Sequence, residues 1–504
     1  MSTFFRALAF LVAVCCLTWV GVLWWWQRTG HSADVSDLVL YLGVLPLAVA
    51  LALLGLRWAW QRGAAARAAA SAAAGGGASV SPAGGGEGAG GAEAQARHAT
   101  VQLVLAQAHT VAGEQAGDVL EAAAAGKPLP RPDPELTNDE GLPVLCARMT
   151  DQALDLDTVR AELDALWPAV HKRLADGPAN EPGEQVLRAL AALKPLLEAQ
   201  RDWLQALHLA QRNALEDGGA SIDRLPPAQR PPLPGLRVLL GWPAHWSAAD
   251  QALGRAWAER CLQGEPDAPG GLADGYAVTV TSLAGSGEEL WWRADQMSHG
   301  AGRAPWLLVA ACDSDLTPER VDTLTTTQRL YDATTRPGGC IPGEAAAALL
   351  LAPADWVPPA DLDLQTVRLH RPALLRRDKP IESPGRVGHR ELAQALEQAL
   401  SAAQVAAADL GMLVCDADLH SQRSAELYGM AVEALHHLDP VEDMRLLGKV
   451  TGHTGAASAL VVLAATAEAV KAVNKPTLAL GMADPHLRMA LVLQPPSASD
   501  AAAA

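Results

Sequence analysis

The sequence is poor in cysteine, and the few cysteines are badly placed for a disulfide or zinc framework. Seven of the 504 residues are cysteine, and two of them, Cys15 and Cys16, lie in an apolar run near the amino terminus. The other five form no CxxC pair and have no closely spaced histidine, so the pattern indicates neither disulfides nor zinc. We expect no metal and no cofactor. These five are Cys146, Cys261, Cys312, Cys340 and Cys415.

Positive charge is also scarce. Lysine and arginine number 39 against 56 aspartates and glutamates, which gives a formal net charge of -17. Binding to a phosphate backbone needs a basic face, so nucleic acid is not an expected partner. The balance favours an acidic soluble domain in a reducing compartment.

Charge is absent altogether from residues 7–26, and a second apolar run covers residues 38–56. Each is long enough to cross a hydrocarbon layer of about 30 Å. A cleaved signal peptide is the alternative for the first run, but that run ends in three tryptophans at 24–26 instead of small residues. Tryptophan prefers the headgroup zone. Residues 1–62 are therefore predicted to be a two-helix membrane anchor whose partner is the lipid bilayer.

The arginines around these runs predict the orientation of the anchor. Arg6 precedes the first run, the loop 27–37 holds one arginine beside two aspartates, and Arg57, Arg62 and Arg67 follow the second run. Lysine and arginine near span ends stay on the cytoplasmic side. We expect a two-pass protein of a bacterial inner membrane with both ends, and the soluble domain, in the cytoplasm.

Beyond the anchor, the composition changes twice. Residues 63–97 are almost entirely alanine and glycine and are predicted to be a flexible linker, with a soluble domain over 98–493 and a disordered tail over 494–504. Within the domain, helical patterns at 113–125 and 158–215 alternate with strand-like runs, which indicates an α/β domain with parallel pairing. The strand-like runs are 98–106, 236–240, 277–280, 306–310, 345–351 and 412–415.

The most specific short segment is Gly452-His453-Thr454-Gly455-Ala456-Ala457-Ser458, which precedes an alanine- and leucine-rich helical pattern. It resembles the GHxxGAA segment of the thiolase superfamily, in particular the β-ketoacyl synthases. The resemblance implies a five-layer α/β/α/β/α domain built from two similar halves, from about 99 to 493, and a homodimer. Further segments resemble that family in the same order, at 110–127, 141–148, 329–351 and 477–493.

Active members of that family use a cysteine nucleophile on a strained turn into a helix, together with two histidines. The resemblance places the nucleophile turn at 281–290, where Ala284 or Gly285 occupies the cysteine position. Ser286 is the nearest nucleophile, but a serine beside glycine more often serves turn geometry. Cys312 lies in a later segment and is predicted to be a buried, inert thiol.

The two family histidines are not equally recognisable. The counterpart of the first is the segment 413–420, which places Asp416 or Asp418 in the histidine slot. His420 is offset by a few residues, and we expect it to be solvated or locally hydrogen-bonded. His453 matches the second histidine. Ser286, Asp416 and His453 are therefore the candidates for a vestigial site.

Two functions follow. The first is a non-condensing, ketosynthase-like binding or adaptor module on a membrane, whose layout looks like that of accessory proteins of bacterial secretion systems such as type VI, with an unidentified protein partner. The second is an acyl-thioester-handling transferase or hydrolase in which Ser286, Asp416 and His453 form an altered site. A tunnel leading to Ser286 would favour the second function.

Overall fold

The structure is a computed structural model that describes residues 97–173, 183–217, 234–264, 272, 275–299, 306–353, 356–358, 364–383, 385 and 387–496. The predicted spans, almost all of the linker and most of the tail lie outside these residues. In the described part, one helical stretch, Gly455–Val473, is long and apolar enough to cross a membrane. Because 78% of its apolar window is buried inside the domain, this stretch is part of the core.

The amino-terminal half contains a five-stranded sheet. Its spatial order is β5-β4-β6-β7-β1, in which β4 runs parallel to β5 and β6 while β7 is antiparallel to both β6 and β1. Both faces of β6 and β7 are buried, as the apolar runs 306–312 and 345–352 within them require. The strands are β1 (Val101–Thr110), β4 (Gly235–Trp242), β5 (Ala277–Ala284), β6 (Trp306–Ser314) and β7 (Glu344–Ala352).

The carboxy-terminal half repeats this order. Its strands run β11-β10-β12-β13-β8, with β9 also paired to β13, so that both halves read third, second, fourth, fifth, first along the sheet. In each half the fifth strand is antiparallel to its neighbours. The strands are β8 (Val367–Leu369), β9 (Ala373–Arg376), β10 (Met412–Cys415), β11 (Met444–Leu446), β12 (Thr477–Gly481) and β13 (Leu487–Gln494).

The expected duplication is thus present, but the expectation of parallel pairing was incomplete. The sheet is mixed, and the two halves are joined by antiparallel pairing of β1 with β8. In the second half, residues 482–486 connect β12 to β13, and so short a connection can only join antiparallel strands. A separate hairpin is formed by β2 (Arg131–Thr137) and β3 (Pro143–Cys146).

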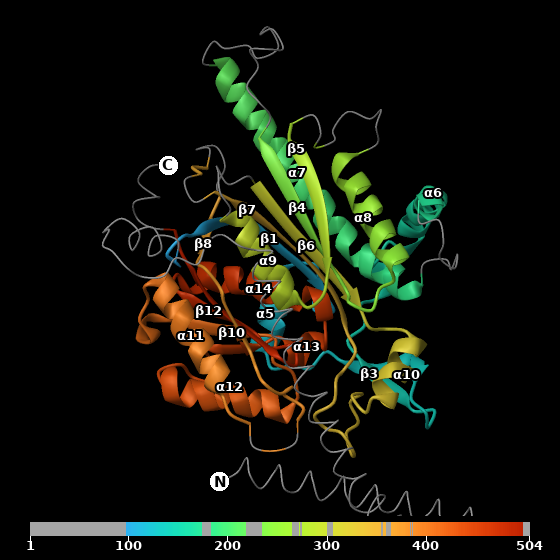
Figure 1. Cartoon of the computed structure of the whole chain (residues 1–504), viewed down its shortest axis with the longest axis vertical. Helices are drawn as coiled ribbons and strands as arrows, with labels where there is room; N and C mark the ends of the chain where they lie inside the picture. The colour runs from blue at the N-terminus through green and yellow to red at the C-terminus, as the bar shows by residue number, and fades with distance from the viewer. Residues whose placement is uncertain are drawn as a thin grey trace, which may run out of the picture. The chain divides into compact units, whose positions relative to one another are not determined.

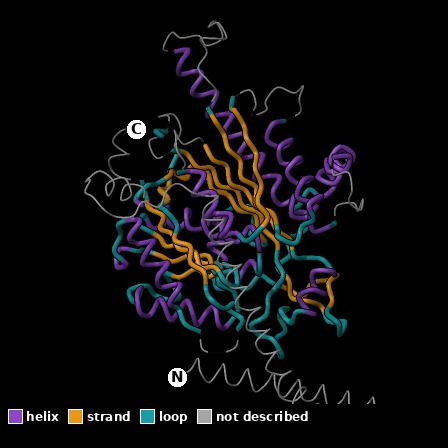
Figure 2. Tube along the Cα trace, in the orientation of Figure 1, coloured by secondary structure: helices purple, strands orange, loops and turns teal. Residues whose placement is uncertain are grey.

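Helices complete five layers (Figures 1 and 2). The central layer, between the strands of the two halves, holds α5, α9 and α14, and α14 packs against β7 and β12 at once. Helices α6, α7 and α8 cover the first half, and α11 and α12 cover the second. The bounds are α5 (Ala116–Ala124), α6 (Leu156–Arg173), α7 (Glu184–Asp217), α8 (Ala248–Gln263), α9 (Gly287–Ser298), α10 (Pro318–Thr326), α11 (Arg390–Ala403), α12 (Ser421–Ala434), α13 (Gly448–Thr451) and α14 (Ser458–Val473).

Helix α14 lies at the centre of the core because every residue from Ser458 to Ala467 is buried. A helical stretch that is apolar all round is stable only when it is buried on every side. The buried Thr466 donates its hydroxyl to the Val462 carbonyl at 2.6 Å, and the polar Glu468 and Lys471 pair with each other at the carboxyl end of the helix.

Successive side chains of β6 point to opposite faces of the sheet. Leu307 and Val309 face the central helix layer, whereas Leu308 and Ala310 face α7.

Each half also buries one arginine–glutamate pair. In the first, Arg188 of α7 donates to the fully buried Glu344 of β7 at 2.7 and 3.0 Å. In the second, Arg488 of β13 donates through Nε to a carboxylate oxygen of Glu426 of α12 at 3.0 Å, and its Nη2 lies 2.9 Å from the same oxygen. These pairs tie an outer helix to the fifth strand of its sheet.

Candidate functional site

Two turns from opposite halves meet at the centre of the domain. The turn after β5 leads into α9, and the GHTGAA segment after β11 leads into α14 through a short 3-10 helix, Gly455–Ala457. A Cβ atom at Gly287 would lie 2.8 Å from the backbone nitrogen of Ala459. Only glycine permits so close an approach, and the two segments that carry the sequence-predicted site therefore lie side by side.

Ser286 is the N-cap of α9. Its backbone is extended, and its hydroxyl oxygen accepts the backbone N–H of Glu289 at 3.3 Å. This is the turn role that the neighbouring glycines suggested. Within the described residues, no hydrogen bond joins Ser286 to Asp416 or to His453.

Asp416 follows β10 directly and is held by the loop after β12. Its two carboxylate oxygens accept the backbone N–H groups of Met482 at 2.6 Å and Ala483 at 3.2 Å. Burial raises the pKa of Asp416 to about 6, against the effect of these bonds.

Glu288, in the first turn of α9, is a site residue that the sequence reading missed. It is fully buried, one of its oxygens accepts the Asp484 N–H at 3.1 Å, and the other has no partner among the described residues. Burial, and next to it the charge of Asp416, raises the pKa of Glu288 to about 7. Two coupled carboxyl groups thus occupy the region where the family resemblance expected a cysteine and a histidine.

His453 is held by Asp315, the first residue after β6. Its Nδ1 lies 3.0 Å from a carboxylate oxygen of Asp315, which Arg320 also contacts at 2.6 Å through its other oxygen. Burial alone would raise the pKa of Asp315, but the hydrogen bond from His453 and the charge of Arg320 hold it well below its usual value. An ionised carboxylate only accepts, so Nδ1 of His453 carries a proton and donates it to Asp315.

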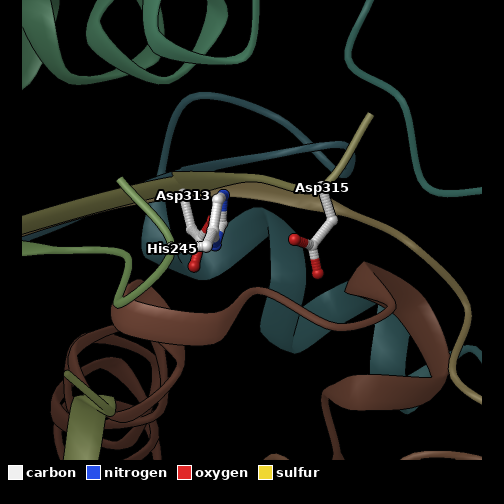
Figure 3. Close-up of side chains that lie close together, drawn as sticks. All are labelled: His245, Asp313 and Asp315. Carbon is white, nitrogen blue, oxygen red and sulfur yellow. The ribbon is translucent and has the colours of Figure 1, made fainter. Parts of the chain in front are cut away.

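Asp313 and His245 lie beside this dyad. Asp313 is the last residue but one of the buried strand β6, and one of its oxygens accepts the Ala456 N–H at 2.9 Å, which fixes the turn after His453. Burial and the neighbouring Asp315 raise the pKa of Asp313 to about 7. His245, in the exposed loop after β4, has its ring next to Asp313 (Figure 3).

The other sequence-based candidates have structural roles. Cys312 is fully buried on β6, and burial raises the pKa of its thiol well above the usual value, which confirms the inert thiol. Burial also raises the pKa of Cys340 and Cys415 to about 12, so neither is a thiolate at neutral pH. His420 is locally bonded, as expected, because its Nδ1 accepts the Gln422 N–H at the start of α12.

A surface pocket of about 740 Å³ lies elsewhere, against α11 and the residues before β9. None of Ser286, Asp416 and His453 lines it. The pocket therefore does not supply the tunnel that would favour an enzyme.

Solved structures share this fold. A β-ketoacyl synthase from Burkholderia phymatum STM815 is 13% identical, matches 79% of this chain and all of its own, and has a TM-score of 0.50. An oxazolomycin ketosynthase domain from Streptomyces albus is 12% identical over 79% of this chain and 74% of its own (TM-score 0.49). A ketosynthase from Xenorhabdus doucetiae, in complex with its chain length factor, is 12% identical over 79% and 98% (TM-score 0.48).

At these identities the likeness establishes the fold alone. The described domain is thiolase-like, as the identical strand order in the two halves of its sheet also shows. No protein-family model matches the sequence, and the comparison with curated proteins gives no match.

Proposed function

We propose that the domain is a non-condensing, ketosynthase-like binding module. One observation carries the proposal: the turn that should present a nucleophile ends in Ser286, whose hydroxyl oxygen caps α9, with no base hydrogen-bonded to it among the described residues. A hydroxyl of ordinary acidity is almost fully protonated at neutral pH and needs such a base to attack a thioester.

The buried acids around this turn add a second reason. Condensation and thioester cleavage both build negative charge on oxygen, which needs hydrogen-bond donors or cations. Glu288 and Asp416 supply carboxyl groups there instead, and once ionised they oppose an oxyanion. The arrangement is suited to holding the scaffold together and not to acyl chemistry.

Intact-mass spectrometry after incubation with acetyl and malonyl thioesters tests the proposal. We expect no covalent adduct on the parent chain, while an active ketosynthase in parallel shows that the assay detects an acyl-enzyme. An adduct on the parent that disappears in Ser286→Ala would establish the alternative, an acyl-handling enzyme whose altered site uses Ser286, Asp416 and His453. An adduct that persists in Ser286→Ala would also refute the proposal, through another nucleophile.

For the binding role, we propose that β5 pairs with β5 of a second copy of this chain. The strand ends the described sheet, so one of its edges has no neighbour there, and its eight residues, AVTVTSLA, carry no charge. An uncharged exposed edge is a template for another strand. The opposite sheet edge, β11, has only three residues, one of them Arg445.

A charge on the edge tests this pairing. Thr279 is exposed on β5, and Thr279→Lys should convert a dimer into a monomer in analytical ultracentrifugation, because lysine on an edge blocks strand addition. Val432→Lys, on the exposed face of α12, is the matched control and should leave the oligomeric state unchanged. A monomeric parent, or a Thr279→Lys dimer, would contradict the proposal.

We also propose that residues 1–62 anchor the domain in a bacterial inner membrane as two spans, with the domain cytoplasmic and a protein partner in an assembly such as a type VI secretion system. The uncharged run 7–26 and the arginines after residue 56 support it. A reporter fused after Arg67 that is active only in an exported compartment would overturn the orientation. Capture of the full chain from detergent-solubilised membrane would identify the partner.

A further inference from the structure

The carboxyl ends of β4 and β6 bring together three side chains that can ligate a metal ion. β4 and β6 are adjacent and parallel, so the loop after β4 and the end of β6 lie at the same edge of the sheet. His245 comes from that loop, and Asp313 and Asp315 come from β6 and the residue after it. One ligand atom from each lies within 4.8 Å of the other two.

One carboxylate oxygen in this cluster, on Asp313, has no hydrogen-bond partner among the described residues. Asp313 is 96% buried, and its Oδ1 accepts no hydrogen bond among the described residues, while its Oδ2 accepts the Ala456 N–H. An acceptor buried without a donor or cation is costly. In Figure 3 the Asp313 carboxyl group lies against the His245 ring, and the Asp315 carboxylate faces the same space.

The surrounding contacts orient the two carboxylates as an outer shell does in known metal sites. Asp313 is fixed by the Ala456 N–H, and Asp315 by Arg320 at 2.6 Å and His453 at 3.0 Å. Ligating carboxylates are themselves hydrogen-bonded in this way. The turn after His453 also requires glycine at position 455, because a side chain at Gly455 would collide with the Asp313 carboxylate.

We propose that His245, Asp313 and Asp315 bind one divalent transition-metal ion of the Zn²⁺ or Mn²⁺ class. One imidazole and two carboxylates form a mixed N/O set, which suits these ions better than Mg²⁺ or Ca²⁺, whose ligands are oxygen alone. Ligands on bonds of about 2.1 Å lie about 3.4 Å apart in a tetrahedral site, so the three ligand atoms, which lie within 4.8 Å of one another, would draw closer together when the ion binds. Water fills the remaining positions.

The ion could enter this site from solvent, and its binding would connect segments of the domain. His245 is exposed, so the site opens to solvent on that side, whereas both aspartates are buried. Bound metal would link the loop after β4 to the end of β6 and, through Asp315, to His453. This inference is independent of whether the domain transfers acyl groups.

The test uses the purified full chain, with any affinity tag removed and metal stripped by a chelator. Titration with Mn²⁺, followed by electron paramagnetic resonance, and with Zn²⁺, followed by calorimetry, should give one tight equivalent. His245→Ala should weaken binding by about 100-fold, because even outer-shell partners contribute 10- to 100-fold. Equimolar Mg²⁺ should not displace Zn²⁺.

Controls separate this site from surface binding and from misfolding. His436→Ala, on an exposed histidine elsewhere, should leave the tight equivalent intact. Asp313→Asn should abolish it, and if that variant does not fold, the exposed His245 decides the outcome. Equal binding by the parent and His245→Ala, no tight equivalent in the parent, or displacement of Zn²⁺ by equimolar Mg²⁺ would overturn the proposal.

Discussion

The two halves of the domain share one strand order but differ in the chemistry at the turn after the third strand. In the first half, that turn ends in Ser286, which caps its own helix. In the second half it presents His453, which Asp315 from the first half holds in place. Close packing of Gly287 against Ala459 depends on backbone shape and not on a nucleophile. The scaffold can therefore persist when the chemistry of one turn is lost.

In both halves a buried ion pair joins the fifth strand to an outer helix, but the strand residue is negative in one half and positive in the other. The fifth strand of the first half carries Glu344, paired with Arg188, whereas the fifth strand of the second half carries Arg488, paired with Glu426. In both pairs the two side chains are buried, and each pair links a strand to an outer helix. The fold fixes where a buried pair is placed but not which residue supplies which sign.

The largest predicted effect comes from breaking one of these pairs. Glu344→Ala should lower the free energy of unfolding by about 3–5 kcal/mol, because Arg188 would remain buried without its main partner. Glu426→Ala should cost a similar amount in the other half. Urea denaturation followed by tryptophan fluorescence measures both.

Asp151→Ala is the control for this comparison. Asp151 also contacts Arg188, at 2.7 Å, but its side chain is 72% exposed. Its removal should change the unfolding free energy by about 0.5 kcal/mol or less. If Glu344→Ala were no more damaging than Asp151→Ala, the pair would not be holding α7 to β7.

A smaller effect should appear as pH dependence. The folded pKa values of Glu288 and Asp416, about 7 and about 6, lie above their ordinary values of 4.5 and 3.8. Between these limits each of the two groups keeps a proton in the folded state that it releases in the unfolded state, so its contribution to stability falls as pH rises from about 4 to about 7 and then levels off. Each unit of difference corresponds to about 1.4 kcal/mol, so each of the two groups can contribute at most about 3 kcal/mol to this fall.

Glu288→Gln should remove much of this slope. The variant loses one buried charge and relieves Asp416 of a charged neighbour, so it should be more stable than the parent at about pH 8 and close to it at about pH 4. Glu289→Gln, on the exposed neighbour, should leave the slope unchanged. If the difference in stability between the parent and Glu288→Gln did not change between about pH 4 and about pH 8, Glu288 would not be held protonated in the folded state.

The fold was largely readable from the sequence because its signals are local. The run 412–415 is β10 to the residue, and the glycine-rich turn before an apolar helix correctly marked α14. The predicted strand at 98–106 begins later, at Val101, and the helical pattern at 158–215 is two helices, α6 and α7. The antiparallel fifth strands were missed because pairing direction is decided by connections and partners far along the chain.

The site was less predictable, since its groups meet only through sheet pairing. Glu288 reads as an ordinary acid in the first turn of a helix, where its charge suits the helix dipole. Asp313 and Asp315 did carry a signal, because two acids lie at the carboxyl end of an apolar run, but the segment was read only for Cys312. His245 lies 68 residues before Asp313 in the sequence, and His453 lies 138 residues after Asp315.

The smallest predicted effect concerns how the two central helices are capped. In α9 the cap is local, from Ser286, whereas at the start of α14 the Ala456 N–H is met by Asp313 from the other half, and the N-cap Ala457 offers no side chain oxygen. Ser286→Ala should therefore cost about 1 kcal/mol of unfolding free energy, while Ser286→Asn should cost almost nothing, because asparagine caps helices as well as serine does. Thermal unfolding of the three chains side by side measures the difference. If asparagine were as damaging as alanine, the hydroxyl of Ser286 would be needed for more than the cap, and the comparison of the two turns would have to be drawn again.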